Sequence, residues 1–251
     1  MIKVITEVVV FSVEGAIAAQ NGGADRIELC ENVHDGGTTP SYGTIVQARN
    51  NLSIQLHVMI RPRSGDFLYS DIEFETMKSD IEQCKVIGVD GVVFGILDSD
   101  AGVDKNRCKQ LVELAKPMTS SFHRAFDRSK NPLLALEDVI ECGFVRILTS
   151  GQKPTAIEGV NLILDLIRLA DNRIIIMPGG GVREDNILEL INKSGALEFH
   201  TSARNIKYSK MKYRKNPLGL GSSFKLNEFE ILGTDEAIIK QFVGKINFRN
   251  K

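Results

Sequence analysis

Several pairs of reactive side chains stand two residues apart, the spacing that places them on one face of an extended strand. Carboxyl and imidazole groups are common general acids and bases, and a thiol is a preferred ligand of Cu(I). The pattern therefore predicts either proton-transfer chemistry on a small molecule or binding of a soft metal ion. The pairs are Glu28 with Cys30, Arg61 with Arg63, and His200 with Ser202.

The segment 122–127 adds His123, Arg124 and Asp127. Alternation along a strand allows either His123 with Asp127, or Arg124, to face the other groups, and the sequence does not decide between them. If His123 faces inward, it is a candidate general base, and Asp127 is a candidate for orienting its ring. Arg61 and Arg63 are candidate clamps for an anionic substrate. The full candidate catalytic set is Glu28, Arg61, Arg63, His123, Asp127 and His200.

A run of three glycines follows the apolar segment that ends at Met177, and Asp185 opens a helix pattern shortly after it. Glycines at such a turn expose backbone N–H groups, which favour phosphate or another anion at a helix start. The alternative is a tight turn from strand to helix with no ligand. The candidate anion-binding residues are Thr149, Ser150, Gly179, Gly180, Gly181, Ser202 and Arg204.

Short apolar runs typical of strands alternate with amphipathic stretches typical of helices along the whole chain. The expected strands cover residues 2–9, 26–30, 54–60, 91–94, 121–126, 146–148, 174–177 and 197–200, with Glu7 near the end of the first. The expected helices cover residues 12–20, 41–48, 73–87, 104–115, 132–141, 159–170, 185–192 and 234–243. Strict alternation is typical of parallel strands joined by crossover helices.

A glycine precedes every second strand by about three residues, at Gly23, Gly88, Gly143 and Gly195. This recurrence predicts a closed parallel sheet, the (β/α)8 TIM barrel. An open doubly wound sheet is the rival, but residues 11–15 lack its GxGxxG motif. In a barrel the candidate site residues converge at the C-terminal mouth, unless some of them, such as Glu7 or Glu28, form interior salt bridges.

No linker divides the chain, so we expect a single domain over residues 1–251. Its one long connection, at about 204–233, is rich in basic residues. We interpret it as a solvated tail covering the barrel mouth, with a lid that binds phosphate or a partner as the alternative. The basic residues are Lys207, Lys210, Lys212, Arg214 and Lys215.

Composition narrows the class of protein. The net charge is −1, which argues against a nucleic-acid partner. The four cysteines form no CxxC pair, so neither a disulfide scaffold nor a structural zinc site is indicated. No run is long and apolar enough to span a membrane, and the N-terminal residues do not read as a secretion signal. These features predict a cytoplasmic protein.

Several blocks together resemble the CutC copper homeostasis family. The resemblance implies a cytoplasmic TIM barrel, commonly dimeric, that has a role in copper tolerance and binds Cu(I) through cysteine. Of two family cysteines proposed as copper ligands, one matches Cys30, whereas Val9 stands at the other position, so Met59 or a histidine would have to assist. The blocks are 22–30, 36–41, 59–63 with 65–67, 122–127, 148–151 and 177–181.

Two functional hypotheses follow. In the first, the protein takes part in copper homeostasis and binds Cu(I), with Cys30 as a ligand. In the second, it is a barrel enzyme that acts on a small anionic or phosphorylated substrate by acid–base chemistry. We expect a homodimer in both cases and no organic cofactor.

Overall fold

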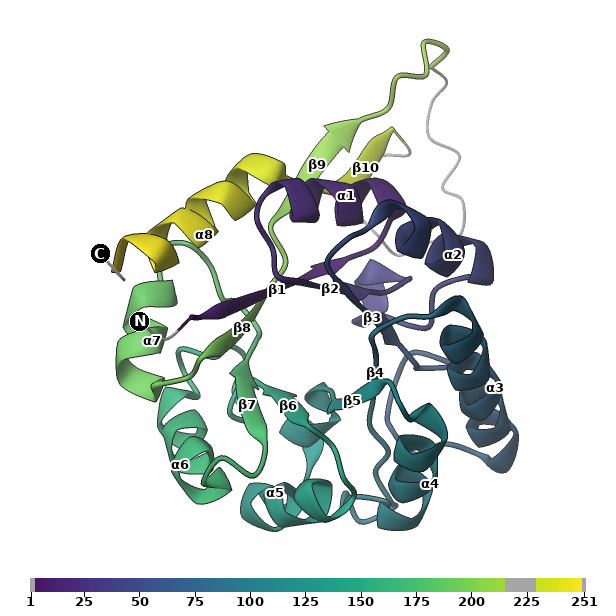
Figure 1. Cartoon of the computed structure of the whole chain (residues 1–251), viewed down its shortest axis with the longest axis vertical. Coiled ribbons are helices and arrows are strands. Elements are labelled where there is room, and N and C mark those ends of the chain that lie inside the picture. The colour runs from purple at the N-terminus through teal and green to yellow at the C-terminus, as the bar shows by residue number, and fades with distance from the viewer. Residues whose placement is uncertain (1–2, 215–228, 250–251) are drawn as a thin grey trace.

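Eight parallel strands form a ring at the centre of the computed structural model, which describes residues 3–214 and 229–249 (Figure 1). From β1 to β7 each strand pairs with the next one in sequence, and β1 pairs with β8. β7 lies beside β8, which completes the barrel. The TIM-barrel prediction is therefore confirmed. The strands are β1 (Ile5–Val10), β2 (Arg26–Leu29), β3 (Gln55–Met59), β4 (Gly91–Phe94), β5 (Thr119–Phe122), β6 (Arg146–Thr149), β7 (Ile175–Pro178) and β8 (Glu198–Thr201).

An outer ring of helices covers the strands (Figure 1). Serine side chains cap several of them, and Ser70 with Glu73 forms a full capping box at the start of α3. Gly88 and Gly195 end their helices with positive φ, as the glycine repeat predicts. The helices are α1 (Val13–Asn21), α2 (Tyr42–Asn51), α3 (Asp71–Ile87), α4 (Lys105–Ala115), α5 (Pro132–Glu141), α6 (Val160–Ala170), α7 (Ile187–Ser194) and α8 (Glu236–Arg249), with short 3₁₀ turns η1 (Val33–Asp35) and η2 (Arg124–Arg128).

Alternate strand residues face the helices and the barrel interior. Val8, Leu29 and Val58 belong to the large apolar core between sheet and helices. Their neighbours in sequence point inward, where the register aligns Glu7 with Arg26 on one side and with His200 on the other. Glu7 lies in the middle of β1 and not near its end, because the strand continues to Val10.

A buried ionic network fills the barrel interior near the N-terminal ends of the strands, where Arg26, Arg146 and Glu198 begin β2, β6 and β8. Arg26 donates to Glu7 at 2.5 Å and to Glu198 at 2.6 Å, and Arg146 donates to the same Glu198 oxygen at 2.6 Å. Glu7 therefore forms an interior salt bridge, the alternative that the sequence left open for it. Paired in this way, the groups avoid the cost of several kcal/mol that an unpaired buried ion carries.

The connection after β8 starts as an antiparallel hairpin of β9 (Arg204–Tyr208) and β10 (Glu230–Thr234). The hairpin extends outward from the ring near α1 (Figure 1). We expected this connection to cover the barrel mouth, and its described part does not. Lys215 lies outside the described residues. Of the helices that the structure describes, none has the length and apolarity needed to cross a membrane.

Candidate functional site

A cavity of about 1050 Å³ opens at the C-terminal ends of the strands, where TIM barrels bind their ligands. It brings together Glu28, Arg61, His123 and His200 from four different strands or strand ends, as their sequence positions predict. Five other candidates also reach its wall: Asp127, Gly180, Gly181, Ser202 and Arg204. The candidates Cys30, Arg63, Thr149, Ser150 and Gly179 are not on the lining.

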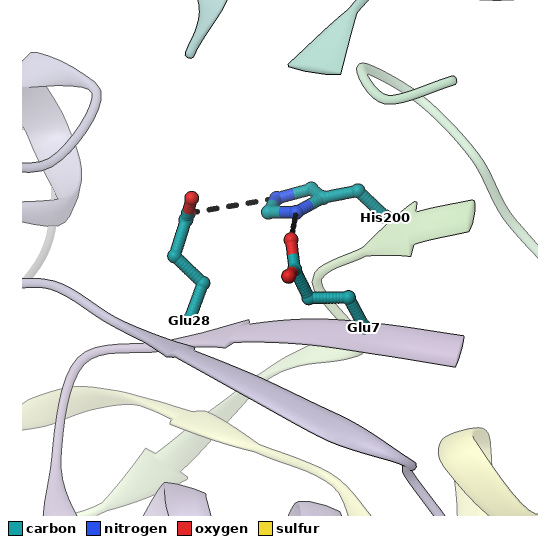
Figure 2. Close-up of side chains that lie close together, drawn as sticks. All are labelled: Glu7, Glu28 and His200. Carbon is teal, nitrogen blue, oxygen red and sulfur yellow. Dashed lines mark hydrogen bonds and ion pairs between the residues drawn. The ribbon is translucent and has the colours of Figure 1, made fainter. Parts of the chain in front are cut away.

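His200 lies between two buried carboxyl groups (Figure 2). Its Nδ1 is 2.7 Å from Glu7 Oε1, and its Nε2 is 3.8 Å from Glu28 Oε2. Burial opposes a charge on the imidazole, but the Glu28 and Glu7 carboxylates outweigh burial and raise the pKa of His200. Burial likewise acts to raise the pKa of Glu7, yet Arg26 and His200 hold that pKa well below its usual range. Glu7 is thus an ionised anchor for the ring.

Glu28 is the carboxyl group at this site that is suited to proton transfer. Burial raises its pKa to about 7, although His200 acts in the opposite direction. Its Oε2 accepts a weak hydrogen bond from the Cys30 thiol at 3.6 Å, and its Oε1 has no hydrogen-bond partner among the described residues. A carboxyl group with a pKa near neutrality can both donate and accept a proton at physiological pH.

Cys30, whose thiol contacts Glu28, belongs to a small apolar cluster with Val9, Met59 and Val93. A Cβ on Gly37 would lie 3.1 Å from the sulfur, so the glycine permits close approach of its loop, in a backbone conformation with φ of +93°. Burial, followed by the nearby Glu28 carboxylate, raises the pKa of the thiol well above its ordinary value. The cysteine is therefore a protonated thiol in the free protein.

A possible metal-ligand group consists of Glu7, Glu28 and His200, whose donor atoms lie within 4.8 Å of one another. Glu7 already pairs with Arg26, so the free donors are His200 Nε2 and Glu28. The Cys30 sulfur touches the same Glu28 oxygen. An imidazole suits copper and a thiol is a soft donor. The Cys30 sulfur lies next to this group but is not a member of it.

His123 faces inward and lines the cavity. Its Nδ1 accepts a hydrogen bond from the Ala125 backbone N–H at 3.3 Å. Burial, together with the Arg61 charge, lowers the pKa of the ring to about 3, so the imidazole is neutral. The partners of Asp127 lie elsewhere, so the predicted orienting contact to His123 is not present.

Asp127 instead fastens the loop after β6. Its carboxylate accepts hydrogen bonds from the Thr149 hydroxyl, the Ser150 amide and hydroxyl, and the Gln152 amide, and it pairs with Arg124. Thr149 and Ser150 are fully buried in this arrangement. Because their hydroxyl groups already bond to a carboxylate, they are poorly placed to bind an added anion.

The three glycines after β7 have different environments. Gly179 packs tightly, since a Cβ there would lie 2.4 Å from Leu148, whereas Gly180 and Gly181 line the cavity with positive φ. Arg124 Nη1 would be 3.3 Å from a Cβ on Gly180. Alternation left Arg124 as an alternative to His123, and both residues in fact reach the cavity.

The two candidate clamps have different environments. Arg61 is buried on the cavity wall, and its guanidinium lies over the Phe67 ring. Arg63 lies outside, where it pairs with Glu73 at 2.6 Å and with Asp66 at 2.9 Å. The clamp prediction for Arg63 is therefore wrong in position. Phe67 was not among the candidate site residues, because it lies in a loop without periodicity, although the block 65–67 that carries the family resemblance includes it.

The CutC family model matches residues 4–205, which include all eight barrel strands. The chain belongs to the CutC family. A CutC family protein from Parabacteroides distasonis is 49% identical over 96% of this chain and 100% of its own length. The human protein named copper homeostasis protein cutC homolog is 47% identical over 92% of this chain and 85% of its own length. The resemblance seen in the sequence motifs is thus confirmed.

Solved structures agree on the fold. A CutC crystal structure from Streptococcus agalactiae superposes with a TM-score of 0.76 at 33% identity, covering 79% of this chain and 98% of that one. Phosphoribosyl anthranilate isomerase from Thermotoga maritima has a TM-score of 0.61 at 14% identity, covering 98% and 99% of the two chains, and shares the fold alone.

Proposed function

We propose that this protein takes part in copper homeostasis, the role for which its human and mouse relatives are named, and that it binds one Cu(I) ion through Cys30 and His200. One observation carries the proposal. The imidazole of His200 and the thiol of Cys30 both approach Glu28 Oε2, at 3.8 and 3.6 Å.

The surroundings of His200 are those of a metal ligand. A ligating imidazole commonly donates its second ring N–H to a carboxylate, which fixes the tautomer and leaves the other nitrogen free for the metal. Glu7 provides that carboxylate at 2.7 Å. Sulfur donors favour soft ions such as Cu(I), and imidazole also suits copper. Met59, in the same cluster as Cys30, offers a thioether as a third donor.

Competition against a Cu(I) chelator under anaerobic conditions tests this assignment. Cys30→Ser removes the thiol and is expected to weaken Cu(I) binding at least about tenfold, because metal binding needs the deprotonated sulfur. Cys84→Ser is the matched control, since Cys84 is equally buried but belongs to the core behind the barrel wall. Equal binding by wild type and Cys30→Ser would refute the copper site.

A second candidate function is acid–base catalysis on a small anionic or phosphorylated substrate. The observation that favours it is Glu28, which lies at the cavity wall with a pKa of about 7 and whose Oε1 has no hydrogen-bond partner in the part of the chain that the structure describes. Glu28 would give or take the proton. Gly180 and Gly181, with Ser202 and Arg204, line the same cavity and would bind the anion through backbone N–H groups and positive charge.

Thermal melts in inorganic phosphate test the anion site. At a phosphate concentration about a hundred times the dissociation constant, binding raises the free energy of unfolding by roughly 2.7 kcal/mol. Gly180→Asp should abolish this increment, whereas Gly43→Asp, with open space around its Cβ, should keep it. Phosphate stabilisation no larger than that of a matched chloride series would remove the basis for a phosphorylated substrate.

We also propose a cytoplasmic homodimer, on the strength of the family resemblance. Light scattering over a range of protein concentrations measures the oligomeric state, and fractionation of cells that express the protein measures its location. A monomer at all concentrations, or recovery outside the cytoplasmic fraction, would refute the corresponding part.

A further inference from the structure

One wall of the cavity is built from Arg61, Phe67 and His123, and the copper site does not use it. Phe67 joins the other two residues. Its ring centroid is 5.2 Å from the Arg61 guanidinium carbon and 4.9 Å from the centre of the His123 ring. The three side chains therefore form one continuous surface that is positively charged and partly apolar.

Arg61 contributes a positive charge that no described acid neutralises through an ion pair. Its side chain is 5% exposed, and its Nη atoms donate to the backbone carbonyls of Asp35, Gly37 and Gly65 at 2.7 to 2.8 Å. Its Nε makes no hydrogen bond of good geometry to any described residue, although the Tyr69 hydroxyl lies close to the guanidinium. Backbone carbonyls satisfy hydrogen bonds but do not cancel the charge, and a buried arginine is normally paired with an anion.

His123 contributes a second donor. Because its Nδ1 accepts the Ala125 N–H and the ring is neutral, the ring proton resides on Nε2. That Nε2 is buried and has no acceptor within the described part of the chain. The wall thus presents one positive charge and two N–H donors that lack acceptors within residues 3–214 and 229–249. One acceptor group with a single negative charge would satisfy them.

We propose that Arg61 and His123 bind the carboxylate of a small organic acid whose apolar part lies against Phe67. A carboxylate offers two oxygens for the two donors, and its single negative charge matches the single guanidinium. A phosphate dianion would leave one negative charge unmatched here. The inference deepens the second candidate function by naming the substrate group, and it assigns His123 a role as a neutral donor.

Titration calorimetry with benzoate and butyrate tests the site directly. Both probes carry a carboxylate on an apolar body, and benzamide is the neutral isostere of benzoate. We expect both carboxylates to bind and benzamide to bind at least about tenfold more weakly, because hydrogen bonds to charged groups are the stronger ones. Failure of both carboxylates to bind, or equal binding of benzoate and benzamide, would overturn the proposal.

Three variants assign the contact to residues. Arg61→Gln and His123→Phe should each weaken benzoate binding about ten- to hundredfold. Arg63→Gln is the matched control, since Arg63 lies two residues after Arg61 but outside the cavity. The affinity of this variant for benzoate should equal that of wild type. His123→Phe keeps an aromatic ring against Phe67, so it decides the question even if Arg61→Gln, which loses three contacts to loop carbonyls, does not fold.

Unchanged benzoate affinity in His123→Phe would overturn the assignment of the second donor. The outcome is also separable from that of the phosphate test. Gly180→Asp should leave benzoate affinity unchanged if the two anions use different walls. Absence of phosphate stabilisation in the wild-type protein, with benzoate binding intact, therefore contradicts the phosphorylated substrate alone. Phosphate stabilisation without benzoate binding contradicts only the carboxylate site.

Discussion

Replacing Glu28 by glutamine should change how stability depends on pH. Glu28 has a folded-state pKa of about 7 against an ordinary value of 4.5, because burial disfavours its charged form. A carboxyl whose pKa is raised on folding takes up a proton on folding, so its contribution to stability is fully present below pH 4.5 and is lost as the pH rises through 7. With these two values, wild type should lose about 2.5 kcal/mol between pH 5 and pH 8 through this group.

Urea unfolding at pH 5, 6, 7 and 8 measures the effect. Glu28→Gln has no carboxyl at this position, so its free energy of unfolding should fall by about 2 to 3 kcal/mol less than that of wild type over the same range. The raised pKa of His200 acts in the same direction, and the variant weakens that contribution as well, because the Glu28 carboxylate is one of its causes. Glu82→Gln, on the exposed side of α3, is the control and should follow the wild-type curve. Parallel curves for wild type and Glu28→Gln would show that Glu28 titrates at an ordinary pKa and would remove it as the acid–base group.

Three further predictions concern the interior ionic network, the loop after β6 and the cysteines. Glu198→Gln leaves Arg26 and Arg146 without their shared acid and should lower the free energy of unfolding in urea by about 3 to 5 kcal/mol. Glu137→Gln, at a surface ion pair with Arg173, is the control and should change it little. Equal effects of the two variants would contradict the importance of the buried network. Asp127→Asn should cost about 2 to 3 kcal/mol and speed hydrogen exchange at the Ser150 and Gln152 amides, so unchanged exchange there would count against the loop-fastening role. All four cysteines are buried, so a thiol reagent at pH 8 should modify them only after denaturant is added, and rapid labelling of the native protein would be inconsistent with the structure.

The barrel could be predicted from the sequence because each of its units is a local pattern. β4 and α5 have the expected boundaries, and the strands that differ do so by a few residues. Alternation also placed Glu28 and His200 correctly, since both lie within strands whose inward face is fixed by the apolar residues between them.

Site predictions were wrong where a strand had already ended. β3 stops at Met59 and Pro62 follows, so alternation no longer applies at Arg63, which points outward. β5 ends at Phe122 and the chain turns into η2, which carries Asp127 away from the His123 ring and toward β6. The role of Asp127 depends on amides more than twenty residues away, and such contacts leave no periodic signal in the sequence.

The interior ionic network has a consequence for how the barrel assembles. Strands β1 and β2 supply one acid and one base, Glu7 and Arg26, while β6 and β8 supply another such pair, Arg146 and Glu198. The contact between Arg26 and Glu198 joins the two pairs. With respect to these four groups, each half of the chain is electrically neutral before it meets the other. The two halves can therefore collapse in either order without enclosing an excess charge, and their docking completes the network across the ring.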